Sequence, residues 1–361
     1  MDISRPFLLT LLLLLPVGFP ALRDLPDTPT KELAVNFPPY LRLFTDGTVE
    51  RLQGTDVVPP SVDQTTGVSS KDIGIQVPQS SSGSPPVPAR LYLPELPAKN
   101  PNQKLPVLVY FHGGAFIVDS PFSHTYHSYL NSLVSKANVV AVSVHYRRCP
   151  EDPLPAAYDD AWTALQWTAS HAAGGSGPEA WLRDHGDLAR INVAGDSAGG
   201  NIAHNVSLRA GREELGNGVK IGGAILINPY FFSEKAVLAV TNAVSQRTLR
   251  TMWKLACPGD CRERFDSRFI NPTVAGEESL GGMGCERVLV CIGGRDFLRA
   301  EDWAYYRALT SSGWKGRAEM FEMEGEKHVF HLTHPDSENA RKLMQRLVHF
   351  LSIRQQGIGS L

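Results

Sequence analysis

The stretch RINVAGDSAGGNIAHNVSLRAG, residues 190–211, is the most informative part of this sequence about its fold class. Residues 191–194 form a short apolar run typical of a buried strand, and residues 201–210 have the spacing of a helix with one apolar side. Between them stands Ser197, with a glycine two residues away on each side. A strand, a sharp turn and a helix around G-x-S-x-G predict a nucleophile elbow, which presents a serine hydroxyl above a sheet.

The two glycines of this pattern have a mechanical explanation. A serine at such a turn lies in strained backbone, and a side chain at Gly195 or Gly199 would collide with the neighbouring strand or helix. The same short pattern also occurs in turns without chemistry. Other parts of the chain must therefore supply a base, a carboxylate and donors for an oxyanion.

Strand-like and helix-like segments alternate on both sides of the elbow. Strand-like segments lie at 87–94, 105–114, 139–147, 221–231, 287–297 and 316–325, and helical ones at 126–138, 156–172, 299–313 and 338–356. This alternation predicts an α/β fold with a mainly parallel, doubly wound sheet. Open sheets of this class bind ligands at the carboxyl ends of their strands.

Two segments fall outside the alternation. Residues 31–67 form a lead-in with a hairpin signal at Asp46-Gly47. Residues 234–272 interrupt the pattern after a strand with helix-like pieces, and such an insertion is expected to lie over the carboxyl ends of the sheet.

The first 30 residues have features of a targeting leader. Arg5 precedes an apolar run at residues 7–15, which is too short to span a bilayer and resembles the central region of a signal peptide. Asp2 and the lack of a clear cleavage site count against this interpretation. We expect a secretory or membrane-associated protein without a stable membrane span, with a cytoplasmic location as the alternative.

Composition excludes several function classes. The 361 residues are 42% apolar and carry a formal net charge of −2, so nothing in the charge argues for a nucleic-acid partner. The five cysteines are an odd number and show no zinc-site spacing with histidine. Cys257 and Cys261 are candidates for a disulfide in an oxidising compartment.

A complete catalytic triad can be assembled around the serine. Its hydroxyl becomes a nucleophile only when a base removes the proton, and that base is usually a histidine held by a carboxylate. Asp296 follows the strand-like segment RVLVCIGGR, and His328 follows the last strand-like segment. The order Ser197, Asp296, His328 is the one found in α/β-hydrolases.

Two alternatives to these partners stay open. His331 lies three residues after His328 and is a second candidate base, and Asp302 is a second candidate carboxylate in place of Asp296. Structural roles are expected for three further aspartates, Asp159, Asp160 and Asp196.

Acyl transfer also requires hydrogen-bond donors for the developing oxyanion. The segment YFHGGAFIVDS, residues 110–120, is a glycine-rich loop after a strand. The expected donors are the backbone N–H groups of Gly113 and Gly114, together with that of Ala198 directly after the nucleophile. Four residues are candidates for the wall of the substrate pocket: Phe116, Tyr230, Phe231 and Val329.

The motifs HGGAF, GDSAGGN, GGRDFLR and GEKHVFHL, together with PEDPLPAAYDDAWTALQW, resemble those of plant carboxylesterases of the hormone-sensitive-lipase-like group. The resemblance covers nearly everything from residue 31 to residue 353. It implies an α/β-hydrolase domain over residues 31–361 with a lid built from residues 31–67 and 234–272. It also implies hydrolysis of small to medium carboxylic esters through an acyl-serine intermediate, without cofactor or metal.

Two relatives of that group provide alternative functions. Gibberellin receptors share the fold but lack the catalytic histidine, whereas this chain has His328. The 2-hydroxyisoflavanone dehydratases share the triad frame, and some carry threonine where this chain has Ser197. A hormone-like binding protein and a dehydratase are therefore the alternatives to an esterase.

This chain departs from the usual pattern of the group at two places. Asn228 in ILINPYF replaces a histidine, and it is expected to alter contacts near the acyl pocket. YRRCPE replaces YRLAPE, so that Arg148 and Cys149 are unusual, and Cys149 is expected to pack in the interior.

Overall fold

The computed structural model describes residues 31–353 except 77–84, 97–102, 173, 176, 240–242, 258, 260–264, 266 and 275–279. The expected leader and Cys261 therefore lie outside the described residues. Cys257 is disulfide-bonded, and Cys149, Cys285 and Cys291 are buried free thiols. Within the described part of the chain, no helix is long and apolar enough to cross a bilayer.

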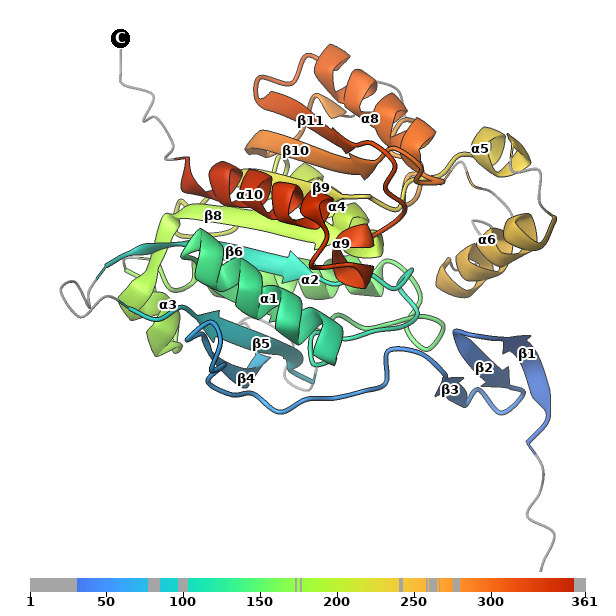
Figure 1. Cartoon of the computed structure of the whole chain (residues 1–361), viewed down its shortest axis with the longest axis horizontal. Helices are drawn as coiled ribbons and strands as arrows, with labels where there is room; N and C mark the ends of the chain where they lie inside the picture. Colours follow the sequence, from blue (N-terminus) through green and yellow to red (C-terminus); the bar gives the residue numbers. More distant parts are fainter. Residues whose placement is uncertain are drawn as a thin grey trace, which may run out of the picture.

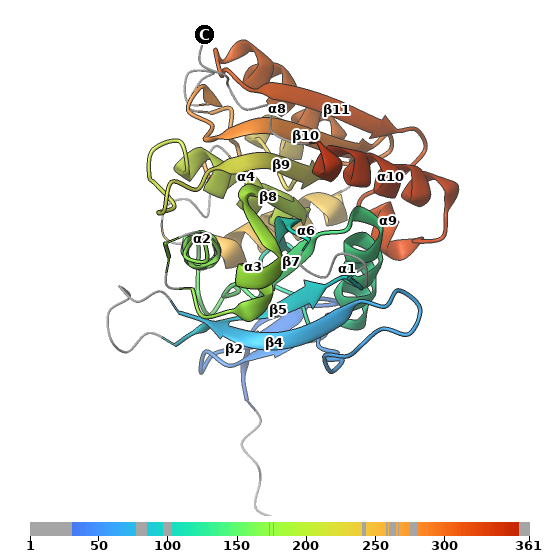
Figure 2. The same cartoon turned by 90° about the vertical axis from the view of Figure 1, so that its left-hand side faces the viewer.

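A twisted eight-stranded sheet forms the centre of the molecule (Figure 2). Its strand order is β11-β10-β9-β8-β6-β7-β5-β4. The six strands from β11 to β7 are parallel, and β5 and β4 continue the sheet in antiparallel pairing. The strands are β4 (Ser69–Ile75), β5 (Val87–Leu93), β6 (Leu105–Phe111), β7 (Val140–Val144), β8 (Gly186–Asp196), β9 (Ile221–Ile227), β10 (Cys285–Gly293) and β11 (Arg317–Met323). The predicted α/β class with a mainly parallel sheet is confirmed.

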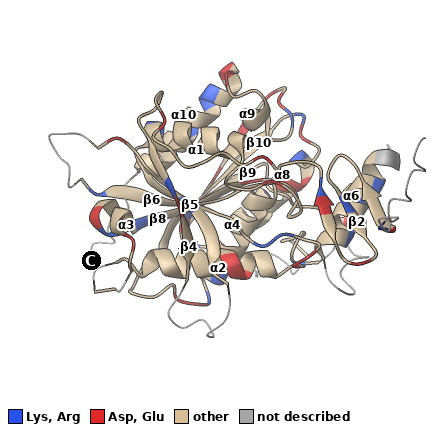
Figure 3. Ribbon diagram, turned by 90° about the horizontal axis from the view of Figure 1, so that it is seen from below, with Lys and Arg blue, Asp and Glu red and all other residues tan. Residues whose placement is uncertain are grey.

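Helices cover both faces of this sheet because its central strands are apolar on both sides. One face packs against α1 (His124–Ala137), α9 (Phe330–Thr333) and α10 (Glu338–Ser352). The opposite face packs against α2 (Ala156–Ala169), α4 (Ala198–Arg209) and α8 (Arg299–Ser311), and α3 (Ala180–His185) precedes β8. Acidic and basic residues are interspersed around these layers (Figure 3).

The lead-in and the insertion lie at the carboxyl-end side of the sheet (Figure 1). The lead-in is a separate antiparallel sheet of β1 (Leu33–Phe37), β2 (Leu41–Phe44) and β3 (Val49–Arg51). Its β2–β3 turn is the predicted hairpin, in which Asp46 accepts the N–H of Thr48 at 2.8 Å. The insertion contains α5 (Glu234–Ala239) and α6 (Ala243–Ala256).

Arg51 joins the small sheet to the main domain. Its guanidinium donates to the carbonyl oxygens of Ile117 at 2.7 Å and Cys149 at 3.1 Å, and forms an ion pair with Glu151 at 2.6 Å. Backbone carbonyls buried in a loop need donors, and a guanidinium can serve several at once. The lead-in is therefore attached directly to the loop that follows β6.

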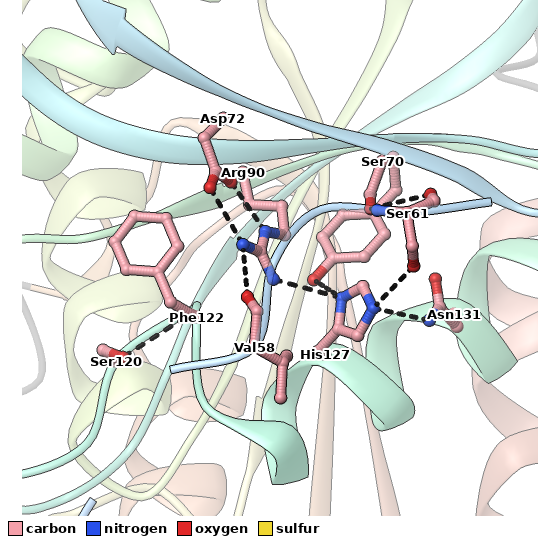
Figure 4. A network of polar contacts seen from close by, with 10 residues as sticks. Val58, Ser61, Ser70, Asp72, Arg90, Ser120, Phe122, His127 and Asn131 are labelled. Atoms are coloured by element: carbon pink, nitrogen blue, oxygen red, sulfur yellow. Dashed lines mark hydrogen bonds and ion pairs between the residues drawn. The ribbon is translucent and has the colours of Figure 1, made fainter. Parts of the chain in front are cut away.

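The segment between β3 and β4 is held by a second arginine (Figure 4). Arg90 is fully buried, forms a two-pronged ion pair with Asp72, and donates to the carbonyl of Val58 at 2.8 Å. His127 on α1 lies against the same guanidinium, 3.3 Å from Nδ1 to Nη1, and its Nε2 lies 3.5 Å from Ser61 Oγ. This network attaches the lead-in segment to both β5 and α1.

Candidate active site

Ser197 occupies the turn between β8 and α4, as the elbow pattern predicted. Its backbone is left-handed in φ, with φ 51° and ψ −117°. A Cβ on Gly199 would lie 1.9 Å from the carbonyl oxygen of Phe111, and one on Gly195 would lie 2.3 Å from Gly199. The close packing of the turn against the end of β6 therefore requires glycine at both positions, which confirms the mechanical reason given above.

The structure brings Ser197, His328 and Asp296 together in one hydrogen-bonded chain. His328 Nε2 lies 2.9 Å from Ser197 Oγ, and its Nδ1 lies 2.9 Å from Asp296 Oδ2. The loop after β10 carries Asp296 and the loop after β11 carries His328, because parallel strands end at the same edge of the sheet. A histidine held in this way can accept the serine proton on one nitrogen while the carboxylate stabilises its charge.

The two alternative partners lie elsewhere. His331 is 3% exposed on α9 and packs edge-on against Tyr129, and burial lowers its pKa to about 3. Asp302 is fully buried on α8, and neither of its carboxyl oxygens has a hydrogen-bond partner among the described residues. Neither residue is hydrogen-bonded to Ser197 or His328.

Three donors orient the carboxylate of Asp296. Oδ2 accepts both His328 and the side-chain amide of Asn228, the latter at 2.5 Å, and Oδ1 accepts the backbone N–H of Leu298 at 3.0 Å. The sequence singled out Asn228 only as a departure near the acyl pocket. The structure instead places it against Asp296, because the end of β9 lies beside the end of β10.

The glycine-rich loop contains the expected oxyanion donors, but one of them is already engaged. The N–H of Gly113 donates to the hydroxyl of Tyr126 at 2.7 Å. By contrast, the N–H groups of Gly114 and Ala198 donate to no acceptor among the described residues, and the same holds for Ala115. The expectation for Gly113 therefore does not fit this arrangement, since a donor bonded to a buried hydroxyl is not free for substrate.

Asp196, directly before the nucleophile, connects this loop to the elbow. Its two oxygens accept the hydroxyls of Tyr110 at 2.7 Å and Tyr126 at 2.8 Å. Burial raises the pKa of Asp196 to about 6, against the opposing effect of the two tyrosine hydrogen bonds. The structural role expected for Asp196 is observed, but its partners come from β6 and α1, which no local sequence pattern indicated.

Backbone strain is concentrated around these groups. Eight non-glycine residues have positive φ in the described part of the chain, and six of them belong to the site or its loops. The six are Ala115, Phe116, Asp119, Ser197, Asn228 and Val329. Such conformations persist only where surrounding contacts enforce them, and they are common at functional sites.

Aromatic side chains surround the triad. Phe116 and Tyr230 are buried and meet edge to face, with ring centroids 6.3 Å apart, and the N–H of Tyr230 donates to the carbonyl of Ser197. Phe231 packs against Tyr305, with ring centroids 4.8 Å apart, and against His204 at 5.4 Å, so its place in the pocket wall stays a prediction.

Comparisons with known proteins agree with this geometry. A family model described as the alpha/beta hydrolase fold matches residues 108–332. The chain is 44% identical to 2-hydroxyisoflavanone dehydratase of Glycyrrhiza echinata over 329 residues, covering 90% of this chain and 98% of that protein. It is 41% identical to probable carboxylesterase 7 of Arabidopsis thaliana, covering 89% and 98%.

Solved esterase structures share the fold. EstE1, a thermostable carboxylesterase cloned from a metagenomic library, superposes with a TM-score of 0.62 at 26% identity, covering 81% of this chain and 90% of that chain. An esterase of the archaeon Pyrobaculum calidifontis gives a TM-score of 0.61 at 26% identity, covering 78% and 84%. The chain therefore belongs to the α/β-hydrolase family, in its group of plant carboxylesterases and 2-hydroxyisoflavanone dehydratases.

Proposed function

We propose that this protein is a serine carboxylesterase that hydrolyses small to medium carboxylic esters through an acyl-serine intermediate. The observation that carries the proposal is the hydrogen-bonded chain from Ser197 Oγ through His328 to Asp296, with both distances at 2.9 Å. The carboxylesterase names among the curated relatives and the solved esterases with the same fold support the same reaction.

In this mechanism Ser197 attacks the ester carbonyl while His328 takes its proton. Asp296 holds the imidazole in position and stabilises its positive charge. His328 then gives the proton to the leaving alcohol, and a water molecule activated by the same imidazole hydrolyses the acyl-enzyme.

The free backbone donors beside the nucleophile would stabilise the oxyanion. We assign this role to Gly114 and Ala198, and we add Ala115 because its N–H is free and its φ of 54° belongs to the strained loop. Gly113, although expected from the sequence, would support the loop through Tyr126 instead.

A lid formed by β1–β3 and the α5–α6 insertion would cover the site. The contact of Arg51 with Ile117 supports this role, because it attaches the small sheet to the loop that carries the oxyanion donors. The insertion also contacts the main domain, because the carbonyl of Ala256 at the end of α6 accepts the N–H of Leu154 at 3.0 Å.

The decisive experiment is hydrolysis of p-nitrophenyl esters of two to eight acyl carbons by the purified protein. We expect turnover that falls by roughly 10⁴-fold or more in both Ser197→Ala and His328→Ala. His331→Ala serves as the matched control for a buried histidine three residues away, and it should retain most of the turnover. No turnover by a folded parent protein would overturn the proposal.

A second candidate is dehydration of a hydroxylated flavonoid. It is favoured by the 44% identity to 2-hydroxyisoflavanone dehydratase, since the same base could remove a proton from a carbon acid. Incubation with 2-hydroxyisoflavanone distinguishes the two reactions, because dehydration releases water from a substrate that has no ester. An esterase without this activity would exclude the second candidate.

A further inference from the structure

Phe297 directly follows the triad aspartate, and its side chain is unusually accessible. The residue is 52% exposed, whereas the buried rings around the triad are nearly closed off from solvent. Single exposed aromatic residues are common on protein surfaces. Phe297 differs from such residues because its ring contacts the imidazole of His328.

Two neighbours hold the ring of Phe297 in place. The imidazole of His328 lies 4.9 Å away between ring centroids, at an angle of 49°. Phe232 stacks on Phe297 at 5.9 Å and 29°; it is 1% exposed, and its N–H donates to the carbonyl of Ile270 at 2.9 Å. Phe297 therefore has a fixed backing on one side, while half of its surface stays open.

The position of His328 identifies the part of the substrate that Phe297 can reach. His328 Nε2 points at Ser197 Oγ, and the same nitrogen must protonate the oxygen of the departing alcohol. The alcohol oxygen therefore approaches the imidazole, and the group bonded to it extends along the histidine side of the site. Phe297 lies on this side.

The other aromatic rings near the nucleophile offer less surface. Phe116 is 0% and Tyr230 is 3% exposed; the two rings pack against each other, and Phe116 also meets Tyr158 edge to face. Most of the surface of these two rings is therefore covered by other protein atoms and is not available to a substrate. Among the aromatic residues that the structure describes, Phe297 combines contact with the catalytic histidine and a large open surface.

We infer that this site prefers esters whose alcohol carries an aromatic ring, and that Phe297 binds this ring as it leaves. Aromatic pairs in offset or tilted geometry gain stability beyond the burial of their area. The inference rests on the proposed esterase function and adds a substrate class to it.

Benzyl acetate and cyclohexylmethyl acetate provide the test, because their alcohols have similar size and acidity and differ in aromaticity. The measured quantity is the ratio of kcat/KM for the two esters in the parent protein, Phe297→Leu and Phe297→Tyr. We expect the ratio to favour benzyl acetate in the parent, to fall by about 2- to 10-fold in Phe297→Leu, and to be retained in Phe297→Tyr. Comparing ratios between variants cancels the intrinsic reactivity of the esters.

A second pair places the ring on the acyl side. Methyl phenylacetate and methyl cyclohexylacetate should show a ratio that the Phe297 substitutions leave unchanged, since the acyl group is bonded to Ser197 and lies away from the departing alcohol. Thermal unfolding of each variant checks that the half-exposed position tolerates the change.

The outcomes separate the two levels of the proposal. Failure of the parent protein to hydrolyse the p-nitrophenyl esters as well as all four of these esters would remove the esterase function itself. Hydrolysis of the p-nitrophenyl esters with none of the four would overturn the substrate preference alone. Hydrolysis of all four, with an alcohol-side ratio that is the same in the parent and in Phe297→Leu, would overturn the role of Phe297 and leave the esterase in place. A change confined to the acyl-side ratio would also overturn it.

Discussion

Asn228 and Asp296 form a 2.5 Å hydrogen bond in which the amide of Asn228 donates to Oδ2, the oxygen that also accepts His328. Asn228 has a left-handed backbone with φ 45°, a conformation that asparagine adopts more easily than most residues. Both its backbone and its side chain therefore suit the place where β9 ends beside the carboxylate of Asp296.

Asn228→Ala removes the amide that donates to Oδ2 of Asp296 and should weaken catalysis, because the carboxylate loses a group that holds it in position and offsets its negative charge. Without the amide donor the carboxylate interacts more strongly with the imidazolium, so the acid limb of the kcat/KM profile should move to higher pH while kcat falls by about 3- to 30-fold. Pre-steady-state and steady-state pH profiles measure both effects.

Asn217→Ala is the matched control for this substitution. Asn217 also has positive φ, 52°, and donates its amide to a backbone carbonyl, that of Ala169 at 3.1 Å. Loss of the Asn217 amide should lower the free energy of unfolding without moving the acid limb of the kcat/KM profile. An unshifted acid limb in Asn228→Ala would show that the amide does not influence the triad charge.

Tyr126→Phe should lower kcat by about tenfold with little change in KM. The substitution removes the acceptor of the Gly113 N–H and one of the two donors to Asp196, so the oxyanion loop loses its attachment beside the nucleophile. Tyr110→Phe removes only the other donor to Asp196. Equal losses in the two variants would mean that the bond to Gly113 has no part in turnover.

Asp302→Asn should stabilise the protein increasingly as pH rises. Burial raises the pKa of Asp302 well above its ordinary value, so the folded state keeps a proton that the unfolded state releases above about pH 4. The stability of the parent protein therefore falls with rising pH by up to about 1.4 kcal/mol per unit from this residue, and the amide removes that loss.

Urea unfolding at pH 5 and pH 8 measures this effect. The stability gain of Asp302→Asn over the parent should be larger at pH 8 than at pH 5. Asp336→Asn replaces an exposed aspartate and is the control. Its free energy of unfolding should change between pH 5 and pH 8 by the same amount as that of the parent. A gain that is equal at both pH values would contradict ionisation as the cause.

His127 should make the protein sensitive to acid. Burial and the neighbouring Arg90 lower its pKa, and a proton on Nδ1 would face the guanidinium at 3.3 Å. The unfolded state binds a proton below about pH 6.5 that the folded state resists, so stability is lost as pH falls below that value.

His127→Gln should remove part of this loss, as measured by the free energy of unfolding at pH 7.5 and pH 5.5. His124→Gln, at an exposed position one turn earlier on α1, is the control. If both variants keep the full acid sensitivity of the parent, another buried histidine such as His204 is responsible.

The sequence by itself determined the local elements and the identity of the chemical groups. The apolar runs and their spacing determine the strands and helices, because each depends on residues a few positions apart. The glycines around Ser197 and the order of serine, aspartate and histidine were sufficient to identify the three triad residues that the structure brings together.

The tertiary structure decided what these groups contact. Asn228 on Asp296, Tyr126 on Gly113, and Phe297 on His328 each join residues separated by 13 to 68 positions in the chain. No local pattern encodes such pairs, since they arise only when parallel strands bring their carboxyl ends to one edge and α1 packs behind the glycine-rich loop. The same packing buries Asp302 and engages the donor of Gly113, because burial and hydrogen-bond partners are properties of the assembled core.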